Sequence, residues 1–141
     1  SKNGTIYYAA PELFRKGQFD TLKTDIYAIG ITLYSISELQ FPFKDGDQQY
    51  IVEQIVKSHL SIRRGLNKQL RRLIENCTAM KPSNRPNIDD LLKDEYLNNE
   101  KLSEKENKSS IKQSLLTFKD SQKSDDKFDT SFDEFIVFGS D

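Results

Sequence analysis

Residues 4–12 read Gly-Thr-Ile-Tyr-Tyr-Ala-Ala-Pro-Glu, and this stretch decides how the rest of the chain is interpreted. Two further stretches follow it: Asp25-Ile26-Tyr27-Ala28-Ile29-Gly30 lies in a long apolar run, and Asn84-Arg85-Pro86 precedes a second apolar segment. Taken alone, each of these residue types is common in loops, and Asp25 could be only a helix cap. The order and spacing of the three stretches therefore carry more information than any single residue.

The pattern of apolar residues predicts helices. The run from Thr24 to Leu39 is apolar on nearly every side and too long for most strands, which predicts a buried central helix. Thr24 or Asp25 is expected to cap its start, and Phe41-Pro42-Phe43 is expected to stop it. Further helices are expected near residues 50–58, 66–77 and 88–97, the last of them capped by Asn87.

Composition divides the chain in two. It has 141 residues, of which 35% are hydrophobic and 30% charged. The apolar residues are concentrated in residues 1–97, which can bury a small core, whereas residues 98–141 are of low complexity and are expected to be disordered. The predicted fold class is mainly α: an irregular helical bundle with an extended N-terminal loop, Ser1–Arg15, and a disordered C-terminal tail.

Charge and apolar runs exclude several classes of function. The net charge of −1 argues against a nucleic-acid partner, and no apolar run approaches the roughly 18 residues needed to span a membrane. Cys77 is the single cysteine, so it is expected to be a core residue rather than a nucleophile or a metal ligand. We expect a cytoplasmic protein with no metal site.

The three stretches together resemble the protein kinase family. Residues 4–12 match the pattern G-T-x-x-Y-x-A-P-E, which is similar to the end of a kinase activation segment. The resemblance covers residues 1–97 and implies the C-terminal helical lobe of a serine/threonine kinase. It implies a substrate-docking loop of Gly4, Thr5 and Tyr8, and structural roles for Ala10, Pro11, Glu12, Asp25, Gly30 and Arg85.

The same resemblance implies how these residues act. Glu12 and Arg85 would form an ion pair that ties the loop to the late helices, because the planar guanidinium can hold a carboxylate with two hydrogen bonds. Asp25 would accept backbone N–H groups of a catalytic loop that this chain does not contain. Thr5 would direct its hydroxyl toward the catalytic aspartate and lysine of that loop.

The motifs for phosphoryl transfer do not occur in this sequence. It has no Gly-rich loop, no H-R-D and no D-F-G, so no catalytic, ATP-binding or metal-binding residue is assigned, and the chain is predicted to be inactive alone. ATP and Mg are implied only for a complete kinase. The expected partners are a protein substrate or the missing remainder of the kinase domain. The alternative is a catalytically inactive, kinase-derived helical scaffold, which a start codon directly before Ser1 would favour.

Two further expectations concern apolar residues without assigned partners. Without neighbouring kinase helices, Ile29, Leu33 and Ile36 are expected to be exposed and to favour self-association. Near residues 132–138 of the tail, Phe135 and Phe138 resemble a linear motif that recruits ubiquitin-like autophagy proteins, and loosely the tail of autophagy-initiating kinases. The alternative is that this run packs back on the lobe or is an incidental apolar cluster.

Overall fold

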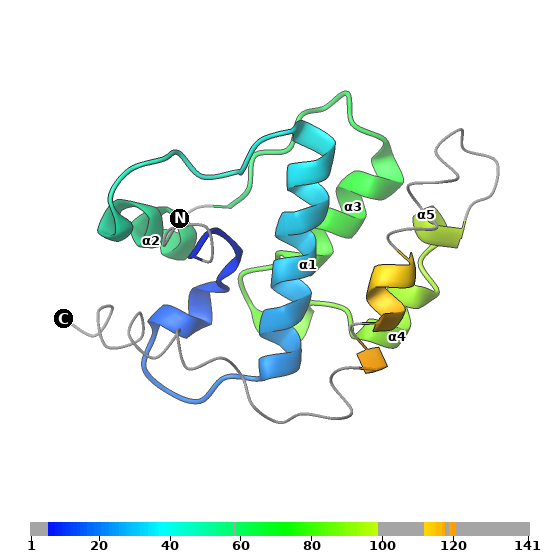
Figure 1. The fold of residues 1–141 in the computed structure, drawn as a ribbon, viewed down its shortest axis with the longest axis horizontal. Coiled ribbons are helices and arrows are strands. Elements are labelled where there is room, and N and C mark those ends of the chain that lie inside the picture. The colour runs from blue at the N-terminus through cyan, green and yellow to red at the C-terminus, as the bar shows by residue number, and fades with distance from the viewer. Residues whose placement is uncertain (1–5, 58, 99–111, 118, 121–141) are drawn as a thin grey trace.

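The computed structural model describes residues 6–57, 59–98, 112–117 and 119–120. These residues form helices and connecting segments, with no strand among them, which confirms the mainly α fold class (Figure 1). The elements are the 3-10 helices η1 (Ile6–Tyr8), η2 (Pro11–Phe14) and η3 (Pro82–Asn84), and the α-helices α1 (Thr21–Glu38), α2 (Gln48–Lys57), α3 (Lys68–Cys77), α4 (Ile88–Leu92) and α5 (Glu95–Asn98).

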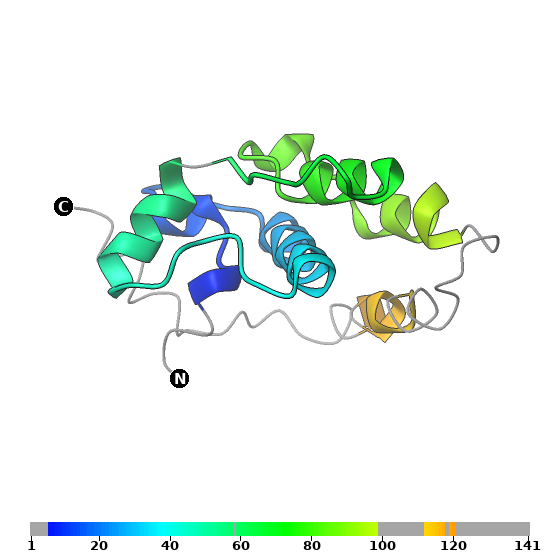
Figure 2. The same ribbon diagram turned by 90° about the horizontal axis from the view of Figure 1, so that it is seen from above.

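Helix α1 runs through the middle of the molecule, with η1, η2 and α2 on one side and α3, α4 and α5 on the other (Figures 1 and 2). It contributes to two hydrophobic cores, which explains why its sequence is apolar on most sides. The first core joins Tyr27 and Ile31 of α1 to η1, η2 and α2, and the second core joins Ile26, Leu33 and Tyr34 of α1 to α3, α4 and α5.

The start of α1 differs from the expectation. The helix begins at Thr21, and its N-cap is Asp20, whose carboxylate accepts the backbone N–H of Leu22 at 2.9 Å. Thr24 and Asp25, the two predicted caps, lie within the helix instead. The apolar pattern missed the first turn because this turn lies at the surface, where Leu22 is 54% exposed.

Gly30 sets the distance between α1 and α3. A Cβ atom at this position would lie 2.5 Å from Thr78 Cγ2 and 2.8 Å from Cys77 Cβ, which is too close for normal contact. Glycine is therefore required here for close approach of the two helices, rather than for an unusual backbone angle.

The last predicted helix is divided into α4 and α5. Asn87 caps α4 as expected, in a capping box in which its side chain accepts from Asp90 N–H and the Asp90 carboxylate accepts from Asn87 N–H. The Asp94 carboxylate then accepts the N–H of Tyr96 at 2.8 Å and starts a new turn. Residues 112–117 and 119–120 are also helical, which the sequence analysis did not anticipate.

The expected exposure of α1 is correct in part. Ile36 is 53% exposed, whereas Leu33 is buried because it faces the second core, and Ile29 is partly buried against that core. Among the described residues, no helix combines the length and hydrophobicity that crossing a membrane requires.

Candidate functional site

The site is built around η1 and η2, which are held between α1 and α2. Ile6, Ala9, Ala10 and Pro11 are buried, so this stretch is fixed by its own small and apolar side chains. Tyr8 is only partly buried. The segment was expected to be an extended loop, but its described part forms two short 3-10 helices, the second of which begins at Pro11.

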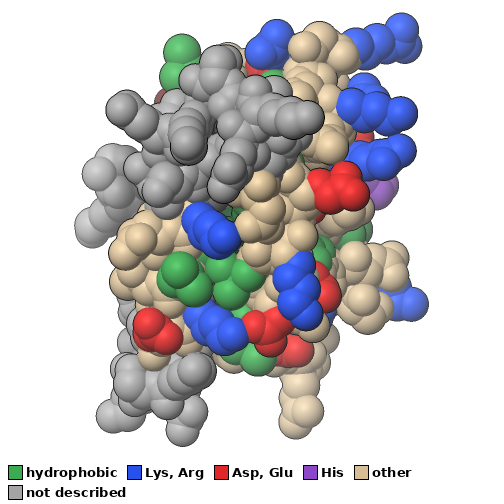
Figure 3. All heavy atoms as spheres, turned by 90° about the vertical axis from the view of Figure 1, so that its right-hand side faces the viewer, with side chains coloured by type: hydrophobic (Ala, Val, Ile, Leu, Met, Phe, Trp, Pro, Cys, Tyr) green, Lys and Arg blue, Asp and Glu red, His purple; other side chains and the backbone are tan. Residues whose placement is uncertain are grey.

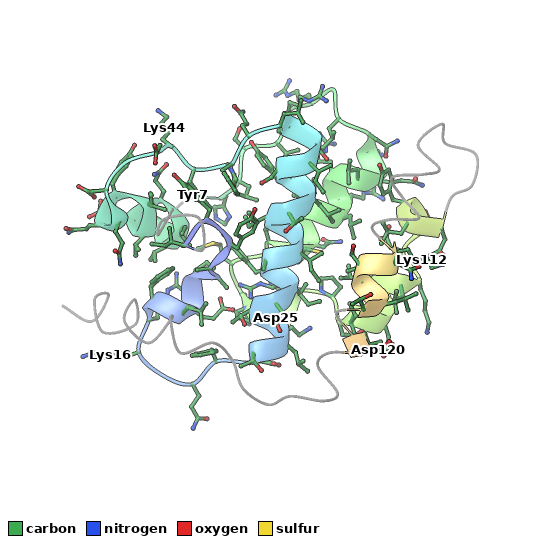
Figure 4. All side chains as sticks on the ribbon, viewed as in Figure 1. Tyr7, Lys16, Asp25, Lys44, Lys112 and Asp120 are labelled. Carbon is green, nitrogen blue, oxygen red and sulfur yellow. The ribbon has the colours of Figure 1, made fainter. Side chains whose placement is uncertain are left out.

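An aromatic cluster joins η1 to the connection between α1 and α2. The Tyr7 ring stacks on Phe41 with a centroid distance of 4.6 Å, and Tyr8 meets the same ring edge-on at 5.3 Å. The Tyr7 hydroxyl donates to Asp45 Oδ1 at 2.7 Å, and this hydrogen bond raises the pKa of Tyr7. Figure 4 shows Tyr7 pointing toward the connection that carries Lys44.

Glu12 and Arg85 form a bidentate ion pair. Arg85 Nη1 donates to Glu12 Oε1 at 2.6 Å, and Nη2 donates to Oε2 at 2.9 Å. The Arg85 side chain is fully buried, and that of Glu12 is 12% exposed. The resemblance implied this pair, and it joins η2 to the segment that follows η3.

Backbone and ring groups hold the rest of the guanidinium. Its Nε donates to the carbonyl of Ala79 at 2.8 Å, and Nη1 also donates to the carbonyl of Lys23 at 2.9 Å. Lys23 in turn donates from Nζ to the Arg85 carbonyl at 2.6 Å. The guanidinium also lies over the Tyr27 ring, 5.0 Å from its centroid. Burial raises the pKa of Tyr27, so this hydroxyl stays neutral.

The remaining predicted residues fall into two groups. Asp25 and Gly30 lie on α1, with Asp25 partly buried near its start (Figure 4) and Gly30 against α3. Gly4, Thr5, Phe135 and Phe138 lie outside the described residues.

Several residues of the site carry no mark in the sequence. Ala79 acts through its backbone carbonyl, which any residue type provides, so no pattern could reveal it. Lys23 contributes both its carbonyl and its Nζ, but a lysine near the start of a helix is not distinctive in sequence. Phe41 is expected from the sequence only as part of a helix stop. No sequence signal joins Phe41 to Tyr7 and Tyr8, because it lies 33 positions after Tyr8 and meets them only in the folded chain.

The described residues contain no group of three or more His, Cys, Asp or Glu side chains that could hold a metal ion. These residues therefore do not fit a magnesium site. Cys77 is buried, and burial raises the pKa of its thiol to about 12, which agrees with its predicted role as a core residue. The site can hold a loop in place and present Tyr8 beside Phe41.

Basic residues form a separate, exposed group. Arg63 and Arg64, which precede α3, and Lys68 and Arg72, which lie on it, are all exposed. Lys and Arg side chains gather with the histidine along one edge of the face shown in Figure 3.

The helical fold, the anchored loop and the buried ion pair define part of a protein kinase domain. The family model of that domain matches residues 1–97, and the chain belongs to the protein kinase family. It is 34% identical over 97 residues to the serine/threonine-protein kinase Nek5 of Homo sapiens, a match that covers 68% of this chain and 14% of Nek5.

Two other relatives are also serine/threonine-protein kinases. The chain is 35% identical over 98 residues to the serine/threonine-protein kinase ppk34 of Schizosaccharomyces pombe, covering 67% of this chain and 27% of that protein. It is 29% identical over 133 residues to the serine/threonine-protein kinase KIC1 of Saccharomyces cerevisiae, covering 93% of this chain and 12% of that protein. The chain therefore spans only a small part of the length of these relatives.

Proposed function

We propose that this chain forms the C-terminal helical lobe of a serine/threonine protein kinase, from the end of the activation segment to the last helix. In that role it docks the protein substrate, while ATP, Mg and the catalytic loop belong to the remainder of the kinase domain. The bidentate Glu12–Arg85 pair is the observation that carries this proposal, because it fixes the loop against the helices as the resemblance implies.

The docking surface follows from the exposed part of the loop. Ala10 and Pro11 are buried and cannot reach a substrate, whereas Tyr8 is partly exposed and Phe41 is 36% exposed. These two rings meet edge-on and offer an apolar surface to a peptide. Tyr8 is therefore the described residue that we assign to substrate docking, with Gly4 and Thr5 preceding it in the motif.

The test begins with the coding sequence upstream of Ser1. In-frame H-R-D and D-F-G motifs there would allow the longer product to be purified and assayed for phosphate transfer from ATP to Ser and Thr peptides. We expect transfer by the longer product and none by residues 1–141. The substitution Tyr8→Ala should raise KM for the peptide more than it lowers kcat, because Tyr8 contacts the substrate and not the nucleotide.

A matched control is Tyr50→Ala, because Tyr50 is 42% exposed on α2 and lies outside the cluster of Tyr8 and Phe41. It should leave KM for the peptide unchanged. Absence of upstream kinase motifs would overturn the kinase proposal and favour the scaffold. Equal effects of the two tyrosine variants would remove Tyr8 from the docking surface.

A further inference from the structure

The helical segment formed by residues 112–117 and 119–120, called here the tail segment, packs on the side of the molecule that carries α4 and α5 (Figures 1 and 2). The match to the protein kinase domain ends at residue 97, so this segment lies beyond the matched residues. The proposed substrate-docking role does not involve it.

Three side chains attach the tail segment to the lobe. Leu115 is 4% exposed and belongs to the second core, together with residues of α1, α3, α4 and α5. Lys112 Nζ donates to Asn98 Oδ1 at 2.8 Å, at the end of α5. Lys119 pairs with Asp89 in the first turn of α4.

These three contacts come from one face of the segment. Positions 112, 115 and 119 are separated by three and four residues, the spacing that places side chains along one side of a helix. The polar contacts lie at either end, and the buried leucine lies between them. The tail segment thus runs from the end of α5 back to the start of α4.

The opposite face of the segment contacts no core. Leu116 is 42% exposed, and Gln113 and Thr117 are exposed as well. On this side of the molecule, a small area of apolar side chains is bordered by Lys, Arg, Asp and Glu side chains (Figure 3).

We propose that α1, α4 and α5 form a docking site for a short amphipathic helix with the pattern Lys-x-x-Leu-x-x-x-Lys, and that the tail segment occupies this site reversibly in cis. A helix of this length is unstable in water on its own, so it forms together with its docking. One buried leucine and two exposed polar contacts hold it, so it opens far more often than the cores do.

The first experiment measures docking by limited trypsin digestion of the whole chain, with cleavage after Lys112 as the readout. Leu115→Asp should accelerate this cleavage about tenfold, because the anchor can no longer be buried. Leu116→Asp is the matched control: the same charge is placed on the neighbouring, exposed leucine, and cleavage should stay at the wild-type rate. Equal rates in the two variants would overturn the proposal.

Leu115→Asp could also accelerate cleavage by unfolding the second core. A second pair of variants, at the surface, separates undocking of the tail segment from unfolding. Lys119→Glu places a negative charge beside Asp89 and should accelerate cleavage after Lys112, while the helical circular dichroism of the chain is retained. The exchange Asp89→Lys with Lys119→Glu should restore protection, because the opposite charges again meet. If Lys119→Glu leaves the cleavage rate unchanged, the Lys119–Asp89 pair does not hold the tail segment, which would contradict the proposal.

The third experiment tests the site in trans. The full chain carrying Leu115→Asp, with its own anchor disabled, is titrated with a labelled peptide of residues 110–122, and binding is followed by fluorescence anisotropy. The wild-type peptide should bind and be competed by unlabelled peptide, whereas the peptide with Leu115→Asp should not bind. Equal binding of both peptides, or of neither, would overturn a leucine-specific docking site.

Discussion

Arg85 and Glu12 are 73 positions apart in sequence, and yet they meet through two hydrogen bonds of 2.6 and 2.9 Å. The guanidinium is fully buried, and it also binds the carbonyls of Ala79 and Lys23. One arginine therefore joins η2, α1 and the turn after α3. Loss of either partner would leave a charge with little solvent to stabilise it.

Glu12→Ala should lower the free energy of unfolding by about 3–5 kcal/mol, because Arg85 would remain buried without its counter-charge. Arg63→Ala is the matched control, since it removes the Arg63–Glu38 pair, whose arginine side chain is 58% exposed. That change should cost about 1 kcal/mol or less. Urea unfolding followed by circular dichroism checks both values, and similar losses would contradict the structural role of the Glu12–Arg85 pair.

Gly30→Ala should destabilise the chain by about 1–3 kcal/mol, because the new methyl group would press on Thr78 and Cys77 and separate α1 from α3. Gly65→Ala introduces the same atom where the nearest neighbour, Arg63 Nη1, is 3.6 Å away. It should be neutral or slightly stabilising. Thr78→Ser, which removes the clashing Cγ2 methyl group, should recover part of the loss in the Gly30→Ala background, as measured by thermal unfolding.

Leu39 follows the end of α1 with φ at 56° and ψ at 28°, and its side chain is 90% exposed. Glycine accepts this left-handed conformation without steric cost, whereas leucine and alanine do not. Leu39→Gly should therefore be more stable than Leu39→Ala by about 0.5–1 kcal/mol. Both variants lose the exposed side chain, so the difference in their free energies of unfolding isolates the backbone. A more stable alanine variant would argue against the assigned conformation.

Burial raises the pKa of the Cys77 thiol from its ordinary value of 9.0 to about 12. The folded state holds this proton more tightly than the unfolded state, so the contribution to stability is complete below pH 9 and declines from pH 9 to about 12. Cys77→Ala should make stability fall less steeply with pH in this window. The native thiol should also resist iodoacetamide at pH 8 and react once urea unfolds the chain. Rapid alkylation of the native state would contradict its burial.

Sequence reasoning succeeded where a residue type is tied to its task. The helix expected at residues 66–77 is present as α3, because its leucines follow one helical face, and Asn87 caps α4 as expected. The Glu12–Arg85 pair is present as the resemblance to protein kinases implied, with two parallel charged hydrogen bonds.

Prediction from the sequence was wrong where many residue types could fill the same structural role. The cap of α1 was placed at Thr24 or Asp25, although Asp20 serves, because several polar residues precede the apolar run. Leu115 stands beside Leu116 in the low-complexity part of the sequence, so nothing in the residue types shows which of the two leucines is buried. Asn98 and Asp89, which bind the tail segment, have no feature in the sequence that distinguishes them from other surface groups.

The Glu12–Arg85 pair also sets the order in which the chain can mature during synthesis. The ribosome releases the N-terminal loop first, but its carboxylate has no arginine to bind until residue 85 has left the exit tunnel. Long-range contacts of this kind slow folding, because the intervening chain must be arranged before they form. Shorter nascent chains thus keep Glu12 hydrated and the loop unanchored, and the loop should acquire protease resistance only after residue 85 has left the exit tunnel.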